Sequence, residues 1–342
     1  MVSLRAVMTA NLDGRLAREA HEVIDRAMVE AHYTHAEARD ADCWFDADRV
    51  ASEPATTAWK RLARWRQAQW RDAQGHPIGS DPYRGGLRGK RVGSRIELEH
   101  ARESGANFLT AQAHAAVRSR LALREDHQVL DADALWADLL SPLALCFNLF
   151  GPLSSSPGDA ERAVRAFWPE LPRGPTSLRF AHCPGRRSPA FLDDDTAFDL
   201  ALEIEGDAGV VFQGLSVLYH EHVEPEAAPP TAALGRYLAV AERSDVFLPG
   251  WQDVLPGSRL QSIWRGHLLV LSMLQHPSRH WQTGRFLLVY PALNPSIALA
   301  VASYRELLRE PSTFSAVTIE SLLRTPGALD RATRDAIQAR YI

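Results

Sequence analysis

A predicted hairpin carries the acidic residues whose spacing is best suited to chemistry. Strand-like runs cover about residues 197–205 and 210–220, with the turn sequence EGDAG between them. Asp199, Ala201 and Glu203 alternate along the first run, so they lie on one face of the predicted strand. Carboxylates on a strand can hold Mg²⁺, which polarises a phosphate and the attacking water. A Glu-x-Lys on the next strand would complete a site that cleaves phosphodiesters.

The second strand lacks those charged partners. Ser216 and Leu218 occupy the two positions at which the Glu-x-Lys pair belongs, and the hairpin contains no lysine. Ser216 is a poor metal ligand, and Leu218 cannot stabilise the water or the developing charge. We therefore interpret Asp199 either as the remnant of a metal site or as an ordinary strand carboxylate.

A segment rich in tryptophan and basic residues precedes the hairpin. Residues 59–95 contain 10 basic and 2 acidic residues, a local balance of +8. Clustered positive charge neutralises phosphates, so this segment predicts contact with nucleic acid. The alternative is a solvated helix face whose tryptophans lie in the core. The predicted contact residues are Arg64, Arg66, Arg88, Lys90, Arg91 and Arg95.

The apolar periodicity predicts the elements that position these residues. Helices are expected over about residues 14–39, 56–73, 97–120, 132–151 (interrupted near Pro142), 159–168, 231–243, 259–275, 295–309 and 329–340. Residues 74–95 are rich in glycine and proline and are expected to form a loop. Strands are expected at about 175–183, in the hairpin, and at 285–290, where RFLLVY is typical of a buried central strand. The predicted fold is a helical N-terminal half followed by a small mixed sheet flanked by helices.

The composition excludes several classes of protein. The chain has 342 residues, enough for two average domains or one large one. Its 46% hydrophobic and 23% charged residues are typical of a globular protein. No apolar run reaches about 18 residues, so we expect no membrane-spanning helix. Cys43, Cys146 and Cys183 are odd in number and far apart, which favours a reducing, cytoplasmic location without disulfides.

A series of short motifs links the chain to a known group of proteins. Between about Gln69 and Leu323, it contains, in order, QWRDAQGHPIG, GSRIELEHARESGANFLT, SPLALCFNLFGPL, CPGR, TAFD, YHE, IWRGHLL, FLLVYPALNP and AVASYRELL. With this order and spacing, the chain resembles bacterial restriction-endonuclease-like proteins of the PD-(D/E)XK nuclease superfamily. The resemblance implies an α/β (α+β) fold with a central mixed sheet flanked by helices. We expect residues 1–95 to form a helical region with a basic arm, and 96–342 to form the nuclease-like core.

The resemblance also implies a metal site. Its ligands would be a helix glutamate, at the position of Glu103, and the TAFD aspartate, Asp199. Tyr219 and Glu221 match the Tyr-x-Glu ending that follows the family's Glu-x-Lys. Ala181 replaces an acidic residue in the strand before Pro-Gly-Arg. Two or three chemically necessary groups are thus replaced, and Glu103 and Asp199 are the expected catalytic and metal-binding remnants.

Three functions are compatible with this pattern. The favoured hypothesis is a catalytically inactive nuclease-fold protein that binds nucleic acid, DNA ahead of RNA, or a protein partner. The second is an active Mg²⁺-dependent DNA endonuclease whose site has moved to Glu103, Asp199, Glu203 or Glu221, with an arginine in the role of the lysine. The third is a cleft that now binds a small molecule or protein. No cofactor is expected under the first hypothesis, and Mg²⁺ under the second.

Overall fold

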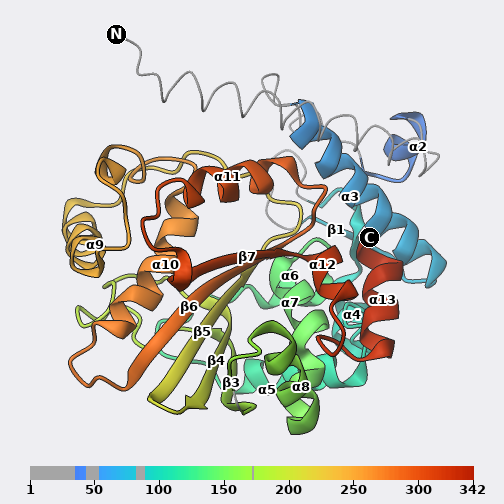
Figure 1. Ribbon diagram of the computed structural model, residues 1–342. Coiled ribbons are helices and arrows are strands. Elements are labelled where there is room, and N and C mark those ends of the chain that lie inside the picture. Colours follow the sequence, from blue (N-terminus) through green and yellow to red (C-terminus); the bar gives the residue numbers. More distant parts are fainter. Residues whose placement is uncertain (1–34, 44–53, 82–88, 172) are drawn as a thin grey trace.

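A five-stranded mixed sheet forms the centre of the fold (Figure 1). The computed structural model describes residues 35–43, 54–81, 89–171 and 173–342. The strands, in their order across the sheet, are β3 (Pro175–His182), β4 (Phe198–Gly206), β5 (Gly209–Val217), β6 (Trp281–Tyr290) and β7 (Phe314–Thr318). The first three are antiparallel, and β6 and β7 run parallel to β5. The predicted α+β fold with a central mixed sheet is confirmed.

Helices cover both faces of this sheet (Figure 1). On one face lie α9 (Thr231–Ser244), η4 (Trp251–Asp253), α10 (Gln261–Leu274), α11 (Pro295–Arg305) and η5 (Pro311–Thr313). The other side holds α3 (Pro54–Ala73), α5 (Ala111–Ala122), α7 (Pro142–Phe150), η3 (Gly151–Ser155), α8 (Pro157–Phe167), α12 (Ile319–Arg324) and α13 (Arg331–Tyr341). The short helices α2 (His35–Asp40), α4 (Leu98–Ser104) and α6 (Ala132–Ala137) complete the described helices.

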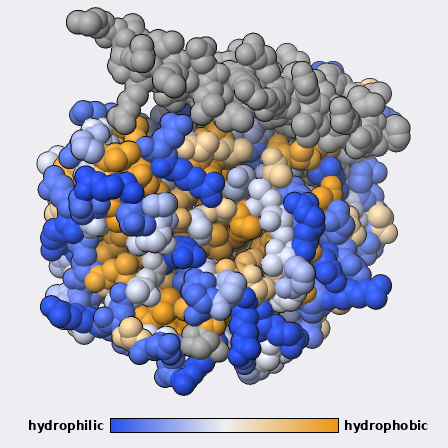
Figure 2. Space-filling model, in the orientation of Figure 1, coloured by the Kyte–Doolittle hydropathy of each residue, from blue (hydrophilic) through white to orange (hydrophobic). Residues whose placement is uncertain are grey.

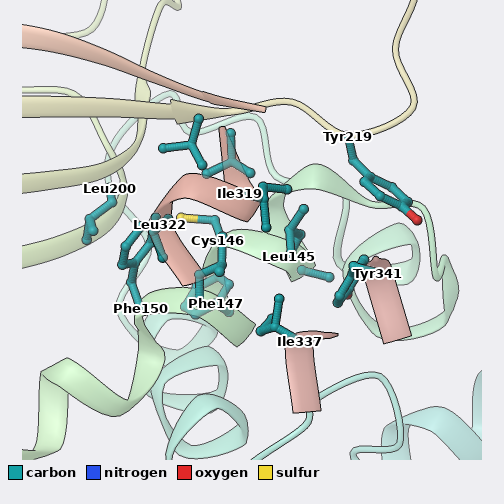
Figure 3. Close-up of a cluster of buried hydrophobic side chains, with 14 of the residues drawn as sticks. Leu145, Cys146, Phe147, Phe150, Leu200, Tyr219, Ile319, Leu322, Ile337 and Tyr341 are labelled. Carbon is teal, nitrogen blue, oxygen red and sulfur yellow. The ribbon is translucent and has the colours of Figure 1, made fainter. Parts of the chain in front are cut away.

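The two faces of the sheet therefore support two apolar cores. Leu200, Leu215 and Val289 point into the first core, where Figure 3 shows Leu200 beside Leu322 of α12 and Phe150 of α7. Ala201 and Phe286 point into the second, beneath α9, α10 and α11. Figure 2 shows hydrophilic residues around the periphery of one face of the molecule and hydrophobic residues toward its middle. Within the described residues, no helix combines the length and apolarity that crossing a membrane requires.

The strand expected at 285–290 lies inside the sheet, as β6 between β5 and β7. Two further expectations, unlike this one, are wrong. The single helix expected at 97–120 is interrupted because Gly105, at φ 68°, ends α4 in a left-handed conformation. The expected loop at 74–95 contains β1 (Ile78–Ser80) paired with β2 (Arg91–Ile96). The helix expected at 14–39 lies almost wholly outside the described residues.

The segment around β2 packs closely on α3 and on the residues that follow α2. A Cβ atom at Gly93 would lie 2.1 Å from the carbonyl oxygen of Ala41 and 2.6 Å from Cys43 Sγ, so this strand requires glycine. On α3, Trp59 Nε1 donates a 3.0 Å hydrogen bond to the Tyr219 carbonyl. Gln67 Nε2 donates to the Tyr219 hydroxyl at 3.1 Å. Helix α3 therefore packs into the same core as the sheet.

Candidate functional site

Asp199 lies at the start of β4, and its carboxylate closes the β4–β5 pairing. The paired residues end at Leu200 opposite Leu215. Beyond them, Asp199 Oδ2 accepts a 2.7 Å hydrogen bond from the backbone N–H of Val217. Burial raises the pKa of Asp199 to about 6, although the Val217 hydrogen bond favours the charged form. The carboxylate thus satisfies a backbone donor that the strand ladder leaves free.

The acid whose charge interacts with Asp199 is Glu221. Its Oε2 accepts a 2.5 Å hydrogen bond from the N–H of Tyr219, just beyond the end of β5. Burial, together with the negative charges of Asp199 and Asp138, raises the pKa of Glu221 to about 7, although hydrogen bonds from backbone N–H groups favour the charged form. The antiparallel hairpin accounts for this proximity because the end of β5 lies level with the start of β4. In the sequence, Glu221 is recognisable only as part of the Tyr-x-Glu motif.

Ser216 faces a different part of the molecule. It lines a cleft of about 890 Å³ bounded by residues 193–197, residues 226–230 and the first turns of α9 and α10. Leu218 follows β5, donates its N–H to the Val289 carbonyl at 2.9 Å, and packs against the second apolar core. Asp199 does not line the cleft. Asp199 and Ser216, two of the predicted catalytic positions, are therefore neighbours in the sheet, but their side chains lie in different environments.

Asp194 and Asp195, two acidic residues that line this cleft, have protein partners. Asp194 accepts hydrogen bonds from Thr196 and from the Tyr237 hydroxyl. Asp195 is held by Arg187 in a two-point ion pair with contacts of 2.9 and 3.0 Å. The described residues contain no group of three or more His, Cys, Asp or Glu side chains arranged to hold a metal ion. In this arrangement they do not fit the Mg²⁺ site that the resemblance implies.

Glu103 lies on α4, outside the central sheet that carries Asp199. Its side chain is exposed, and the helix packs mainly on α6. Asp199, in contrast, lies at the start of β4, and its charge adds to the burial that raises the pKa values of Cys146 and Glu221. The structure therefore offers Glu221, rather than Glu103, as the carboxylate near Asp199.

Ala181, at the position of the missing strand acid, has an unusual backbone conformation. Its φ is 47°, in the left-handed region, and its carbonyl accepts hydrogen bonds from three side chains. The donors are Arg120 at 3.1 Å, Gln128 at 3.2 Å and Arg186 at 2.9 Å. Because Arg186 belongs to the CPGR motif, this motif has a structural role at the end of β3.

Glu125 neutralises the positive charge beside Ala181. It contacts His182 at 2.5 Å, accepts from the Cys183 N–H at 3.2 Å, and pairs with Arg186. Although burial opposes its charged form, these partners lower the pKa of Glu125 to about 2. No sequence motif identified Glu125, since its partners come from a segment about sixty residues away.

The basic surface expected at 59–95 is smaller than predicted. Arg64 and Arg95, two of the six predicted contact residues, are buried, with only 3% and 6% of their surface exposed. Arg95 pairs with Asp138 at 3.3 Å. These two residues therefore cannot form part of an exposed phosphate-binding surface, which corrects the prediction for both.

The reason is that α3 packs on β2, so part of its arginine row faces the small sheet. Arg71 shows this directly, because its Nη1 donates a 2.5 Å hydrogen bond to the carbonyl of Gly93. Lys90 and Arg91 are exposed, and Arg66 is partly exposed. Arg88 lies outside the described residues.

Tyr219, the other residue of the Tyr-x-Glu ending, belongs to a buried polar network. Gln67 connects its hydroxyl to the guanidinium of Arg340, whose Nε donates to Gln67 Oε1 at 2.8 Å. Arg340 also donates to the carbonyl and side chain of Asn107 at 2.8 and 2.6 Å. Its guanidinium lies 4.2 Å above the ring of Trp70. This network fixes α13 against α3 and identifies Tyr219 as a structural residue.

Comparison with known proteins identifies one family. A family model described as PD-(D/E)XK nuclease superfamily matches residues 54–342. This range includes α3, the five-stranded sheet and α13, and it crosses the predicted domain boundary at residues 95 and 96. No curated protein and no solved structure matches the chain significantly.

Proposed function

Because the chain belongs to the PD-(D/E)XK nuclease superfamily, we propose that it uses the nuclease fold to bind nucleic acid without cleaving it. Following the resemblance to restriction-endonuclease-like proteins, the proposed ligand is DNA rather than RNA. A protein that acts together with the bound DNA is the proposed partner. In this role the chain recognises or protects a duplex, and any hydrolysis is performed by another protein.

The observation that carries the proposal is the divergence of Asp199 and Ser216. A metal-dependent nuclease needs carboxylates that converge on one ion beside the phosphate. Here Asp199 is bonded to the Val217 N–H, while uncharged Ser216 lines the cleft. Leu218 contributes an apolar side chain where the lysine should stabilise charge. The three positions together therefore lack both the metal ligands and the cation that hydrolysis requires.

Exposed basic residues support the binding part of the proposal. Lys90 and Arg91 lie at the start of β2, and the Arg91 side chain is 69% exposed. Arg91 is only 3.8 Å from Asp42, but this pair is exposed and therefore weak. A phosphate can replace such a partner at little cost. Partly exposed Arg66 of α3 is the third proposed contact residue.

Cleavage and binding are tested separately with the full chain. For cleavage, supercoiled plasmid and linear duplex are incubated with Mg²⁺ or Mn²⁺, with Asp199→Asn as the matched variant. For binding, fluorescence anisotropy measures affinity for labelled duplex DNA, single-stranded DNA and duplex RNA at about 50 mM and about 200 mM salt. We expect no cleavage, together with DNA binding that weakens steeply as salt rises.

Two results would contradict the proposal. Metal-dependent cutting that disappears in Asp199→Asn would establish an active endonuclease, because this substitution preserves the shape of the side chain and removes its charge. Absence of binding to all three nucleic acids at the lower salt concentration would refute the binding role.

A further inference from the structure

Two histidine side chains meet outside the central sheet, near the end of α3. His76 Nδ1 lies 3.2 Å from His100 Nε2, and the centroids of the two rings are 5.3 Å apart. His76 follows α3, and His100 lies on α4. Each belongs to one of the motifs that carry the resemblance, QWRDAQGHPIG and GSRIELEHARESGANFLT. Neither histidine takes part in the site at Asp199 or in the proposed DNA contacts.

The backbone of His76 is fixed by the way in which α3 ends. Gly75 has a φ of 72°, in the left-handed conformation that follows the last turn of many helices. Its N–H donates to the Asp72 carbonyl at 3.0 Å, and the N–H of His76 donates to the Arg71 carbonyl at 3.1 Å. The His76 ring lies beside Trp70, with ring centroids 5.7 Å apart. His76 therefore leaves α3 in a defined direction.

The backbone of His100 is fixed by Glu97. The N–H groups of Glu99 and His100 donate to the Glu97 carboxylate at 3.2 and 2.7 Å. The N–H of Glu97 in turn donates to the Pro77 carbonyl at 2.9 Å. Because Pro77 directly follows His76, this bond joins the two segments that carry the histidines. The pair is thus held together by its backbone, and a ligand that both rings bind would need little further ordering of the chain.

The two facing nitrogen atoms have the spacing of metal ligands. Zn²⁺–N bonds of about 2.0–2.1 Å at tetrahedral angles place two ligand nitrogens about 3.3 Å apart, close to the 3.2 Å of this pair. The hydrogen bond between the rings requires at least one neutral imidazole, which is the form that binds metal ions. Imidazole nitrogen suits zinc, copper and nickel, whereas magnesium prefers oxygen. A small rotation of the rings would replace the shared proton by such an ion.

Access and charge around the pair set the affinity to expect. Both histidines are partly exposed, so an ion can reach them from solvent. The Glu97 carboxylate adds negative charge beside His100. Arg340 opposes a cation, because its guanidinium lies 4.2 Å above the Trp70 ring that His76 contacts. Two protein ligands and these opposing charges favour moderate rather than tight binding.

We propose that His76 and His100 bind one Zn²⁺ ion, which joins the end of α3 to α4. Among the described residues, no third His, Cys, Asp or Glu side chain is arranged to share the ion, so water molecules complete its coordination. Folding brings the two ligands together, so the ion binds the folded chain in preference to the unfolded chain and stabilises the fold. The site is independent of the proposed function.

Titration calorimetry and thermal unfolding of the full chain test the proposal, after a chelator has removed metal ions. In calorimetry we expect Zn²⁺ to bind with a Kd of about 10–100 µM. Zn²⁺ at about ten times this Kd should raise the Tm by about 2 °C. Mg²⁺ at the same concentration should leave the Tm unchanged, because it prefers oxygen ligands.

Substitution of each histidine locates the ion. His76→Gln and His100→Gln remove one ligand each, and each should weaken this Zn²⁺ binding at least about tenfold. The matched control is His127→Asn, because His127 is exposed and asparagine tolerates its φ of 56°. It should bind Zn²⁺ like the wild type. Thermal unfolding without metal establishes that each variant retains the fold.

The proposal is wrong if Zn²⁺ neither binds to the wild type in calorimetry nor raises its Tm. Equal responses of the wild type, His76→Gln and His100→Gln to Zn²⁺ would also refute it, because the ion would then bind elsewhere. An equal loss of binding in His127→Asn would assign the effect to exposed histidines in general. An equal rise in Tm with Mg²⁺ would assign it to the charge of the ion, and either of these two results would overturn the site.

Discussion

The carboxylate of Asp199 accepts a 2.7 Å hydrogen bond from the backbone N–H of Val217, on the neighbouring strand. This contact gives the aspartate of the TAFD motif a structural role at the end of the β4–β5 pairing. It also directs the carboxylate away from the cleft that Ser216 lines. A residue whose type indicates metal chemistry is thereby used to satisfy a backbone donor.

The first prediction concerns the pH dependence of stability at Asp199. Burial raises its pKa from 3.8 to about 6, so the folded state binds the proton more tightly than the unfolded state. The resulting stabilisation is fully present below the unfolded pKa and is lost as pH rises through about 6. The free energy of unfolding is measured in urea at about pH 5 and about pH 8. Between these two pH values it should fall by about 1–2 kcal/mol less in Asp199→Asn than in the wild type.

The control for this measurement is Asp207→Asn, in the exposed turn of the same hairpin. It should keep the wild-type difference between the two pH values. An unchanged difference in Asp199→Asn would show that the aspartate titrates at its ordinary pH.

The second prediction concerns restoration of the nuclease site. Ser216→Glu places a carboxylate toward the cleft, and Leu218→Lys adds the missing cation. We expect the double variant to nick plasmid only slowly with Mn²⁺, because the Asp199 carboxylate must leave the Val217 N–H and turn toward the cleft before it can share an ion with the new carboxylate. Ser216→Gln with Leu218→Met is the uncharged control and should be inactive. Equal nicking after Asp199→Asn is added would assign the activity to another site.

The third prediction distinguishes exposed from buried arginines in DNA binding. Lys90→Gln with Arg91→Gln should weaken binding to all duplex sequences alike and reduce the salt slope by about 2, one for each lost phosphate contact. The control is Arg162→Gln with Arg165→Gln on α8, where the side chains are 64% and 58% exposed. Equal effects of the two double variants in fluorescence anisotropy would refute a specific basic surface.

The fourth prediction concerns Glu125. Its pKa falls from 4.5 to about 2 in the folded state, so its stabilising contribution is present above the unfolded pKa. That contribution is lost as pH falls through about 2. Glu125→Gln should lower the free energy of unfolding by about 1–3 kcal/mol at pH 7, measured in urea. Glu205→Gln, which breaks an exposed pair with Arg173, should change it by less than about 0.5 kcal/mol. Similar losses of unfolding free energy in the two variants would show that the buried contacts of Glu125 stabilise the fold no more than an exposed ion pair does.

The fifth prediction concerns Arg340, which is 1% exposed. Arg340→Met removes the donors that serve Gln67 Oε1 and Asn107 Oδ1 and leaves these two side-chain oxygens buried without those partners. We expect a loss of about 3 kcal/mol in the free energy of unfolding. Arg334→Met, on the same helix and without an ion pair to any described residue, should cost less than about 0.5 kcal/mol. A tolerated Arg340→Met would show that the network is dispensable for stability.

The sequence by itself determined the central architecture. RFLLVY predicted a buried strand because a continuous apolar run is stable only when both faces are covered, and β6 occupies that position. EGDAG predicted the hairpin because turn chemistry is local, and β4 and β5 pair across it. The ordered motifs also indicated the superfamily, which the match over residues 54–342 confirms.

Only the tertiary structure decided what the polar side chains do. Arg64 and Arg95 are buried because α3 packs on β2, a contact between segments that periodicity cannot connect. Gly105 ended a helix that apolar spacing alone would continue. Glu221, rather than Glu103, lies near Asp199 because strand pairing brings the end of β5 level with the start of β4. Local pattern specifies which residues can form strands and helices, whereas burial and charge partners depend on neighbours that the chain supplies from a distance.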